Sequence, residues 1–135
     1  MALKRIIKLK EGIKEAKARD FKKINTQVEH IKKEISTIER EAEEVNEKLK
    51  TVFSEGLIFQ YRALMARKKE LMEKLHELEL IREKKREELK QAYRDLKALD
   101  ILRINKERED MIKSLNLEFQ RAGFTHLVRQ RFRNG

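Results

Sequence analysis

Apolar residues recur along this chain at alternating steps of three and four positions. One series runs through Ile24, Val28, Ile31, Ile35, Ile38, Ala42, Val45, Leu49 and Val52. A second series runs through Leu57, Tyr61, Leu64, Lys68, Leu71, Leu75 and Leu78. A sustained seven-residue apolar repeat is typical of helices that wind around each other in a left-handed coiled coil. The pattern therefore predicts two long helices.

The short segment between the two series predicts how these helices are connected. Gly56 is the only glycine between Gly12 and Gly123, and Ser54 can cap the helix that follows it. Because a short connection makes consecutive helices antiparallel neighbours, we expect an all-α, long antiparallel two-helix coiled-coil hairpin forming a single domain. The predicted segments are a helix over about 3–53, a turn at 54–56, a helix over about 57–122, and a short basic tail at 123–135.

The pairing of the two series supports the hairpin independently. Folding the chain about the turn brings apolar positions together as Val52 with Leu57, Val45 with Leu64, Ile38 with Leu71, and Ile31 with Leu78. Lys68 falls opposite Ala42 and Lys17 opposite Ala92, so each long aliphatic stem can cover a small residue and carry its charge to water.

The two ends of the chain show further apolar residues. In the first helix we expect a stripe of Leu3, Ile6, Leu9, Ile13 and Ala16, with a local unwinding of the supercoil before Ile24. The hairpin register places Leu3 near Lys106, so residues 107–122 have no partner helix within the chain. An exposed stripe of Met111, Ile112, Leu115 and Phe119 is unfavourable in water, and we expect a partner to cover it.

Composition favours solvated helices over a globular core. Charged residues make up 43% of the chain and aromatic residues 6%, with no proline, tryptophan or cysteine. The absence of cysteine excludes disulfides, thiol nucleophiles and thiolate metal sites. No apolar run approaches the ~20 residues that span a bilayer, and the start lacks an apolar segment of signal-peptide length. We therefore expect no membrane insertion.

Positive charge is concentrated at the two ends of the chain. The net charge is +10, and residues 1–23 hold nine Lys or Arg against three acidic residues. Lys4, Arg5 and Lys8 lie in the first turns, where the helix macrodipole disfavours cations. They form either an ordinary solvated face or a surface for an acidic partner. In a hairpin both chain ends lie together, which predicts one strongly basic end.

No residue pattern indicates catalysis. His30, His76 and His126 are too scattered for a metal site, and the glutamates between Glu39 and Glu47 alternate with cations on a solvated face. No nucleophile elbow, phosphate-binding glycine loop or dinucleotide fingerprint is present. We expect a non-enzymatic protein without metal or cofactor.

Binding to nucleic acid is the main alternative function. A sequence pI near 9.8 is the electrostatic signature of such proteins. However, acidic residues alternate with basic ones over most of the chain, and Tyr61 and Tyr93 do not form a stacking platform. We expect no specific nucleic-acid target. Binding to a membrane surface through the first 23 residues is a third alternative.

Several stretches resemble a known family. The start, Leu3–Glu11, is similar to the opening of FliJ-type proteins, with paired aliphatic residues followed by a basic-acidic turn. The stretches Glu88–Leu102 and Lys106–Glu109 look like the later half of that family. The stretch Phe59–Leu89 also resembles the YscO-type relatives of virulence injectisomes. The likeness extends over nearly the whole chain, except the tail after Gly123.

The resemblance implies the central stalk of a bacterial type III secretion ATPase. In that family a two-helix coiled coil inserts its terminal end into the hexameric ATPase ring, and its hairpin contacts the export gate in the membrane. Some members also handle export chaperones. This implies a cytoplasmic protein, peripheral at the inner-membrane secretion apparatus. Whether the system is a flagellum or an injectisome stays open.

Two sets of candidate partner-binding residues follow. The set expected at the ATPase ring consists of Lys4, Arg5, Lys8, Lys10, Met111, Ile112, Leu115, Phe119 and Arg121. At the turn, Phe53, Ile58, Phe59 and Tyr61 bring large apolar groups together, and only Tyr61 belongs to the seam. Either these residues plug the end of the coiled coil, or Ile58 and Phe59 stay exposed and dock on the export gate.

Overall fold

Two long helices make up the protein. The computed structural model contains α1 (Ala2–Thr51) and α2 (Glu55–Asn134), and it describes the backbone of residues 2–134 and the side chains of residues 2–123. No strand occurs among the described residues, so the predicted all-α helical hairpin is confirmed. The chain divides into two compact units: unit 1 is Met1–Glu11 with Arg94–Gly135, and unit 2 is Gly12–Tyr93.

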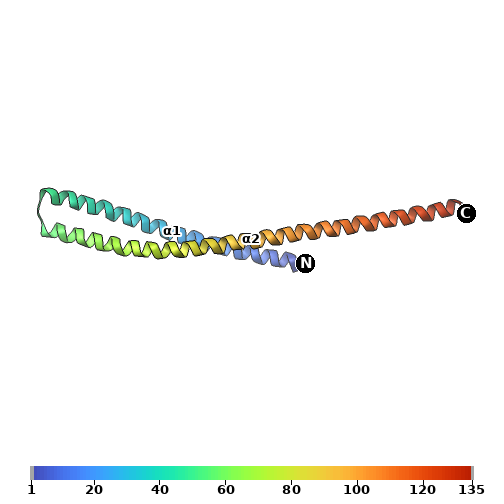
Figure 1. Cartoon of the computed structure of the whole chain (residues 1–135), viewed down its shortest axis with the longest axis horizontal. Helices are drawn as coiled ribbons and strands as arrows, with labels where there is room; N and C mark the ends of the chain where they lie inside the picture. The colour runs from blue at the N-terminus through green and yellow to red at the C-terminus, as the bar shows by residue number, and fades with distance from the viewer. Residues whose placement is uncertain (1, 135) are drawn as a thin grey trace. The chain divides into compact units, whose positions relative to one another are not determined.

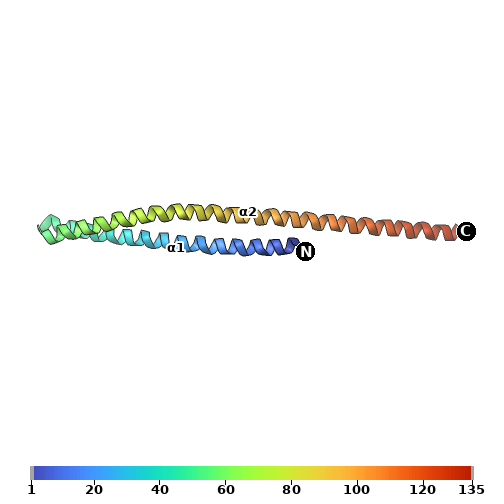
Figure 2. The ribbon, with the colours of Figure 1, turned by 90° about the horizontal axis from the view of Figure 1, so that it is seen from below.

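Unit 2 contains the turn of the hairpin. Its parts of α1 and α2 run in opposite directions from the turn, as Figures 1 and 2 show. Leu71 of α2 packs with Ile31 and Ile35 of α1 in one buried cluster. The buried apolar residues of the unit are Val28, Ile31, Ile35, Ala42, Val45, Leu71 and Ala92. All but Ala92 belong to the two predicted series, and Ala92 was predicted opposite Lys17, so the seven-residue repeat marks the seam correctly.

An ion pair between Lys68 and Glu39 crosses the seam of unit 2. Lys68, which is half-buried, places its Nζ 3.2 Å from Glu39 Oε1 on α1, beside the buried Ala42. This agrees with the predicted role of Lys68, whose stem lies in the seam while its charge reaches outward.

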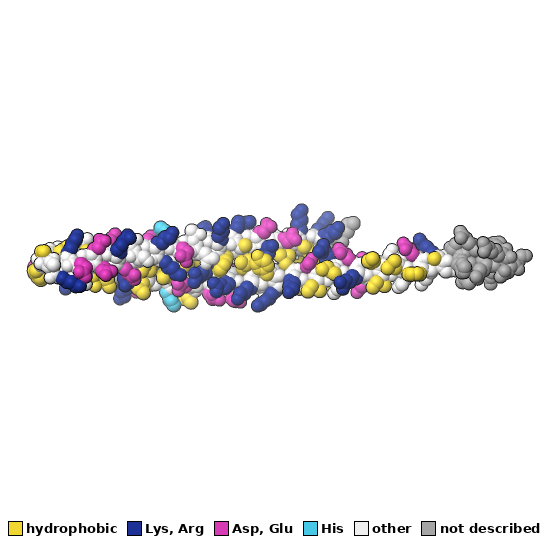
Figure 3. Space-filling view, turned by 90° about the horizontal axis from the view of Figure 1, so that it is seen from above, with side chains coloured by type: hydrophobic (Ala, Val, Ile, Leu, Met, Phe, Trp, Pro, Cys, Tyr) yellow, Lys and Arg dark blue, Asp and Glu magenta, His cyan; other side chains and the backbone are white. Residues whose placement is uncertain are grey.

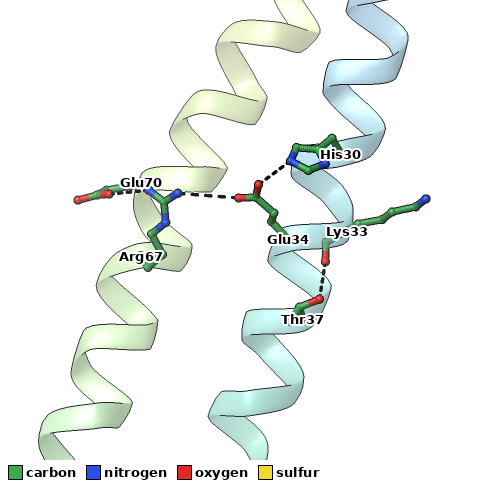
Figure 4. Close-up of polar contacts among 6 residues, drawn as sticks. All are labelled: His30, Lys33, Glu34, Thr37, Arg67 and Glu70. Carbon is green, nitrogen blue, oxygen red and sulfur yellow. Dashed lines mark hydrogen bonds and ion pairs between the residues drawn. The ribbon is translucent and has the colours of Figure 1, made fainter.

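A short chain of polar contacts joins the same two helices (Figure 4). Glu34 on α1 accepts a contact of 2.8 Å from His30 Nε2 and lies 3.8 Å from Arg67 Nη2 on α2. Arg67 in turn lies 3.3 Å from Glu70. Glu34 is half-buried and the other three side chains are exposed, so each pair contributes at most about 1 kcal/mol. The buried apolar seam, rather than these pairs, supplies most of the stability.

The turn lies slightly earlier than the sequence predicts. Residues 52–54 are non-helical, α1 ends at Thr51, and Gly56 already belongs to α2 without a positive φ. The backbone N–H of Leu57 donates to Ser54 Oγ at 3.3 Å, so Ser54 is the N-cap of α2, as expected. A helix begins directly after its N-cap, which makes Glu55 the first helical residue, and a negative charge is favourable there.

The predicted stripe at the start of α1 is wrong in part, because Leu3 and Ala16 are half-buried but the three residues between them are exposed. On the part of α1 in unit 1 the half-buried residues are Leu3, Ile7 and Lys10, whereas Ile6 and Leu9 are exposed, with 64% of Leu9 accessible. In unit 2, Lys14 and Lys17 are half-buried, while Ile13 is exposed. The seam therefore keeps its three-four spacing and needs no local unwinding. Lysine stems tolerate seam positions because their ammonium groups reach outward, as Lys14 does 5.4 Å from the Tyr93 ring.

The predicted end of the second helix is also corrected. α2 continues past Ala122 and Gly123 to Asn134, so residues 123–134 are helical rather than a separate tail. No described glycine has a positive φ, and Gly123 therefore does not form the left-handed cap that ends many helices. A glycine within a helix costs only about 1 kcal/mol, which flanking helix-forming residues can offset.

Candidate partner-binding surfaces

The predicted cations of the ring-binding set lie in unit 1. Lys4, Arg5 and Lys8 are exposed on α1, and Arg121 is exposed on α2. Lys10 differs from the others because it is half-buried in the seam, with its Nζ 3.9 Å from the carboxylate of Asp95. The outward-facing cations on α1 are therefore Lys4, Arg5 and Lys8, whereas Lys10 contributes to the packing of α1 on α2.

The predicted apolar residues of the ring-binding set are all exposed. Met111, Ile112, Leu115 and Phe119 lie on the part of α2 that extends beyond the first residues of α1 in unit 1. Figure 3 shows apolar side chains on the surface of this part of α2. Four further apolar residues of α2 in unit 1 are exposed and were not in the predicted set: Ile101, Leu102, Ile104 and Leu117.

Most of these residues form one stripe with coiled-coil spacing. The positions Ile101, Ile104, Arg108, Met111 and Leu115 follow one another at steps of three and four, and Ile112, Phe119 and Ala122 extend the same face. We call these eight residues the reverse stripe. Leu99 faces the seam, and Ile101 follows two residues later, which corresponds to a rotation of about 200° around the helix. The reverse stripe therefore lies on the face of α2 that points away from α1.

The position of the reverse stripe restricts the direction from which a partner can cover it. Beyond Leu99 the seam face of α2 carries Arg103, Lys106, Asp110 and Lys113 before its next apolar residue, Leu117. A helix that prolonged α1 along the same line would meet these polar side chains and leave the reverse stripe exposed. The stripe therefore needs a helix or groove on the opposite side of α2.

The turn in unit 2 forms a second exposed apolar surface. Phe59 is 76% exposed and Ile58 is half-buried, while Phe53 is 83% exposed and Val52 is also exposed. Phe53 belongs to the non-helical segment and Phe59 to the first turns of α2. Of the two predicted residues, only Phe59 is freely accessible. The chain has 43% charged residues, yet Glu55 is the only charged residue between Thr51 and Tyr61.

Phe59 should be dispensable for folding. We expect Phe59→Ser to change the free energy of unfolding by no more than about 0.5 kcal/mol, since surface substitutions rarely do more. Ile58→Ser, at a half-buried position on the same turn, serves as the comparison and should cost more. Urea unfolding followed by circular dichroism measures both. A larger loss for Phe59→Ser than for Ile58→Ser would show that Phe59 plugs the coiled coil.

The remaining polar features of the described residues are an open groove and exposed charge pairs. Among the described residues no three His, Cys, Asp or Glu side chains come close enough to hold a metal ion. One open groove on unit 2 is lined by Met65, Lys68, Met72 and His76. The pKa of Lys50 is raised above its ordinary value because its ammonium donates a hydrogen bond of 2.8 Å to Glu47. That pair is exposed and lies on one helix face, where such pairs are common.

No helix in the described part of the chain has both the length and the apolar character to cross a bilayer. The chain is similar to an uncharacterized protein of Aquifex aeolicus (strain VF5), with 28% identity over 131 residues. That similarity covers 94% of this chain and 47% of the Aquifex protein, so the chain spans about half the length of this relative. No family model and no solved structure matches. The resemblance to FliJ-type and YscO-type proteins therefore stays a prediction.

Sequence reasoning missed two parts of these surfaces. Ile6 and Leu9 were assigned to the seam, although the three-four spacing continued from Ile24 leads to Lys10 and Ile7 instead. Ile101 and Ile104 lie outside the predicted set, and the change in apolar phase after Leu99 is the signal that places them on another face of α2. Continuing the three-four spacing of the apolar residues without interruption predicts the exposed face in both cases.

Proposed function

We propose that this protein is the non-enzymatic central stalk of a type III secretion ATPase. In this proposal unit 1 inserts into the hexameric ATPase ring and stimulates it, and the turn of unit 2 contacts the export gate for protein secretion. The family resemblance suggests the role. The observation that carries the proposal is the combination found in unit 1, where α1 exposes cations and α2 exposes an apolar stripe. No other described part of unit 1 covers the stripe.

The two kinds of side chain have different physical roles in such a contact. Charge attraction between Lys4, Arg5 and Lys8 and an acidic collar varies slowly with angle, so it tolerates several orientations of a helix within a ring. Exposed charge pairs add little net affinity, however. Met111, Leu115 and Phe119 supply the apolar anchor, since buried large apolar groups dominate interface energies.

The turn would bind the export gate through its aromatic residues. Phe53 and Phe59 are mostly exposed and can enter apolar pockets without unfolding the hairpin. Ile58 is half-buried, so it would support Phe59 rather than act as an equal contact. The family resemblance also implies an export chaperone as a further partner. In this role the protein would act in the cytoplasm, at the inner-membrane secretion apparatus.

The direct test is the turnover of a purified hexameric secretion ATPase with and without this protein. The candidate ATPase should come from the same organism and be assayed at low salt and near physiological salt. The proposal predicts a saturable increase in turnover that weakens as salt rises. Unchanged turnover at saturating concentrations of a folded protein would reject the stalk function.

The alternative function is non-specific binding of nucleic acid, which the net charge of +10 favours. We expect any binding to RNA or DNA to fall steeply with salt and to vanish near physiological ionic strength, because only phosphate neutralisation would drive it. A fluorescence-anisotropy titration over a salt series measures this. Sub-micromolar, sequence-dependent binding near physiological salt would instead promote nucleic-acid binding over the stalk function.

A further inference from the structure

Together with Glu118, the reverse stripe of α2 contains an unbroken seven-residue repeat. Its core positions follow one another at steps of three and four, and they are Ile101, Ile104, Arg108, Met111, Leu115, Glu118 and Ala122. All of these residues are exposed in unit 1. Most are apolar, and the two charged residues, Arg108 and Glu118, have opposite signs. Such spacing is typical of a helix face that packs on another helix.

Within the described residues, no helix of the same chain covers this face. α1 packs on the opposite side of α2, where Leu96 and Leu99 are half-buried. The α2 helix of a second copy can therefore approach the reverse stripe without meeting the α1 of the first copy. Each α1 would stay on the outer side of such a pair.

The repeat is complementary to itself when the second α2 runs in the opposite direction. If a two-fold axis passes through position 113, residues at equal distances before and after that position face each other across the pair. The facing core residues are Ile104 with Ala122, Arg108 with Glu118, and Met111 with Leu115, and each contact is formed twice. Between positions 104 and 122, every charged core residue therefore meets the opposite charge, and every apolar one meets an apolar residue.

The residues beside the core fit the same arrangement. On one side of the pair, Glu107 comes next to the partner's Arg121. On the other side, Ile112 comes next to the partner's Ile112 close to the axis, which widens the apolar contact. Charges that flank a coiled-coil core select the partner and its orientation. Core and flanks therefore favour one antiparallel register.

Other registers bring these charges into unfavourable positions. In a parallel pair in register, Arg108 would face the partner's Arg108, and Glu118 would face the partner's Glu118. Shifting the antiparallel pair by one heptad would place Arg108 against the partner's Met111 and Glu118 against the partner's Ile101. A charge that loses water without gaining a partner is strongly destabilising, and like charges repel.

We propose that the reverse stripe of α2 binds the reverse stripe of a second copy of this chain, with the two α2 helices antiparallel. The contact is symmetric, as expected for a two-fold dimer. This inference goes beyond the stalk function, because the dimer covers Met111 and Leu115, which that function assigns to the ATPase ring. Dimerisation and ring binding through this stripe exclude each other, so the dimer separates when the protein enters the ring.

The absence of cysteine from the chain makes the register directly testable. Ile104→Cys and Ala122→Cys are both at exposed positions, and the two full-length variants are mixed, mildly oxidised and analysed on a non-reducing gel. The dimer predicts that the mixture forms a covalent dimer several-fold faster than either variant alone. In the proposed register two copies of position 104 are roughly 27 Å apart along the helix axis, too far to crosslink. Faster crosslinking of either variant with itself would overturn the antiparallel pairing.

A charge exchange tests the polar contacts separately. Arg108→Glu and Glu118→Arg should each weaken the dimer at least about tenfold, because like charges then face each other. An equal mixture of these two variants should associate with the wild-type affinity, since opposite charges again face each other at both positions. Lys113→Glu makes the same change in net charge on the opposite face of α2, and it should leave the dimer unchanged.

Sedimentation equilibrium measures all of these affinities. The wild-type chain should be a dimer at micromolar concentration, and a monomer over the whole accessible range would overturn the proposal and leave the stripe to a different protein. Charge variants that associate as strongly as the wild type would contradict the register. These measurements need no ATPase, so they succeed or fail independently of the stalk function.

Discussion

Leu71→Ala is expected to lower the free energy of unfolding by about 3 kcal/mol, the largest stability effect we anticipate for a single substitution. Leu71 is 2% exposed and packs against Ile31 and Ile35 from the opposite helix. Truncation removes buried methyl groups and leaves a cavity that two straight helices cannot readily close. Because folded proteins are stable by only about 5–15 kcal/mol, the loss should be easy to measure by urea unfolding.

Met72→Ala is the matched control. Met72 is the next residue on α2, it is half exposed, and alanine is an equally good helix former. Its replacement should change the free energy of unfolding by no more than about 0.5 kcal/mol. Equal effects at the two positions would mean that the seam of unit 2 does not run through Leu71. Both variants should be compared at one protein concentration.

The largest functional effect should come from Leu115→Ala combined with Phe119→Ala. If unit 1 anchors the protein in an ATPase ring, this variant should need at least about tenfold more protein for half-maximal stimulation, through faster dissociation. Both side chains are exposed, so the helix content should be unchanged. Reversing Lys4, Arg5 and Lys8 to glutamate should act differently, by slowing association and altering its dependence on salt.

Leu117→Ala provides the control on the same helix. Leu117 is exposed like Leu115, but it lies on the side of α2 that faces away from the reverse stripe. It should leave stimulation unchanged. If the double variant and the charge-reversed variant both stimulate the ATPase as well as the wild type does, the ring contact proposed for unit 1 is wrong.

Local pattern was enough to predict the hairpin of unit 2. A repeat such as Ile31, Ile35 and Ile38 admits one buried face, and a second repeat such as Leu71, Leu75 and Leu78 supplies the surface to cover it. Ser54 marked the beginning of α2 because a side-chain oxygen at that position satisfies a backbone N–H that has no helical partner. These features depend on residues within a few turns of each other, which a sequence displays directly.

The candidate surfaces could be predicted only in part. The exposure of Met111, Leu115 and Phe119 followed from the register alone, and the structure agrees. The exposed face of Ile6 and Leu9 did not follow, because apolar residues at the start of α1 fit two different faces and Lys10 appears unsuited to a seam. The preference for leucine and isoleucine over lysine in a seam is a local rule, and here the pairing of the helices overrides it.

The content of the fold follows from local pattern: two helices, a short turn capped by Ser54, and the seam through Leu71. Which side chains each helix leaves exposed depends instead on how the helices pair. The supercoil keeps one unbroken spacing along α1, so Lys10 is drawn into contact with Asp95 while Leu9 points outward. A helix presents one face at a time to its neighbour, and the position of that neighbour, rather than the hydrophobicity of any one residue, selects the face.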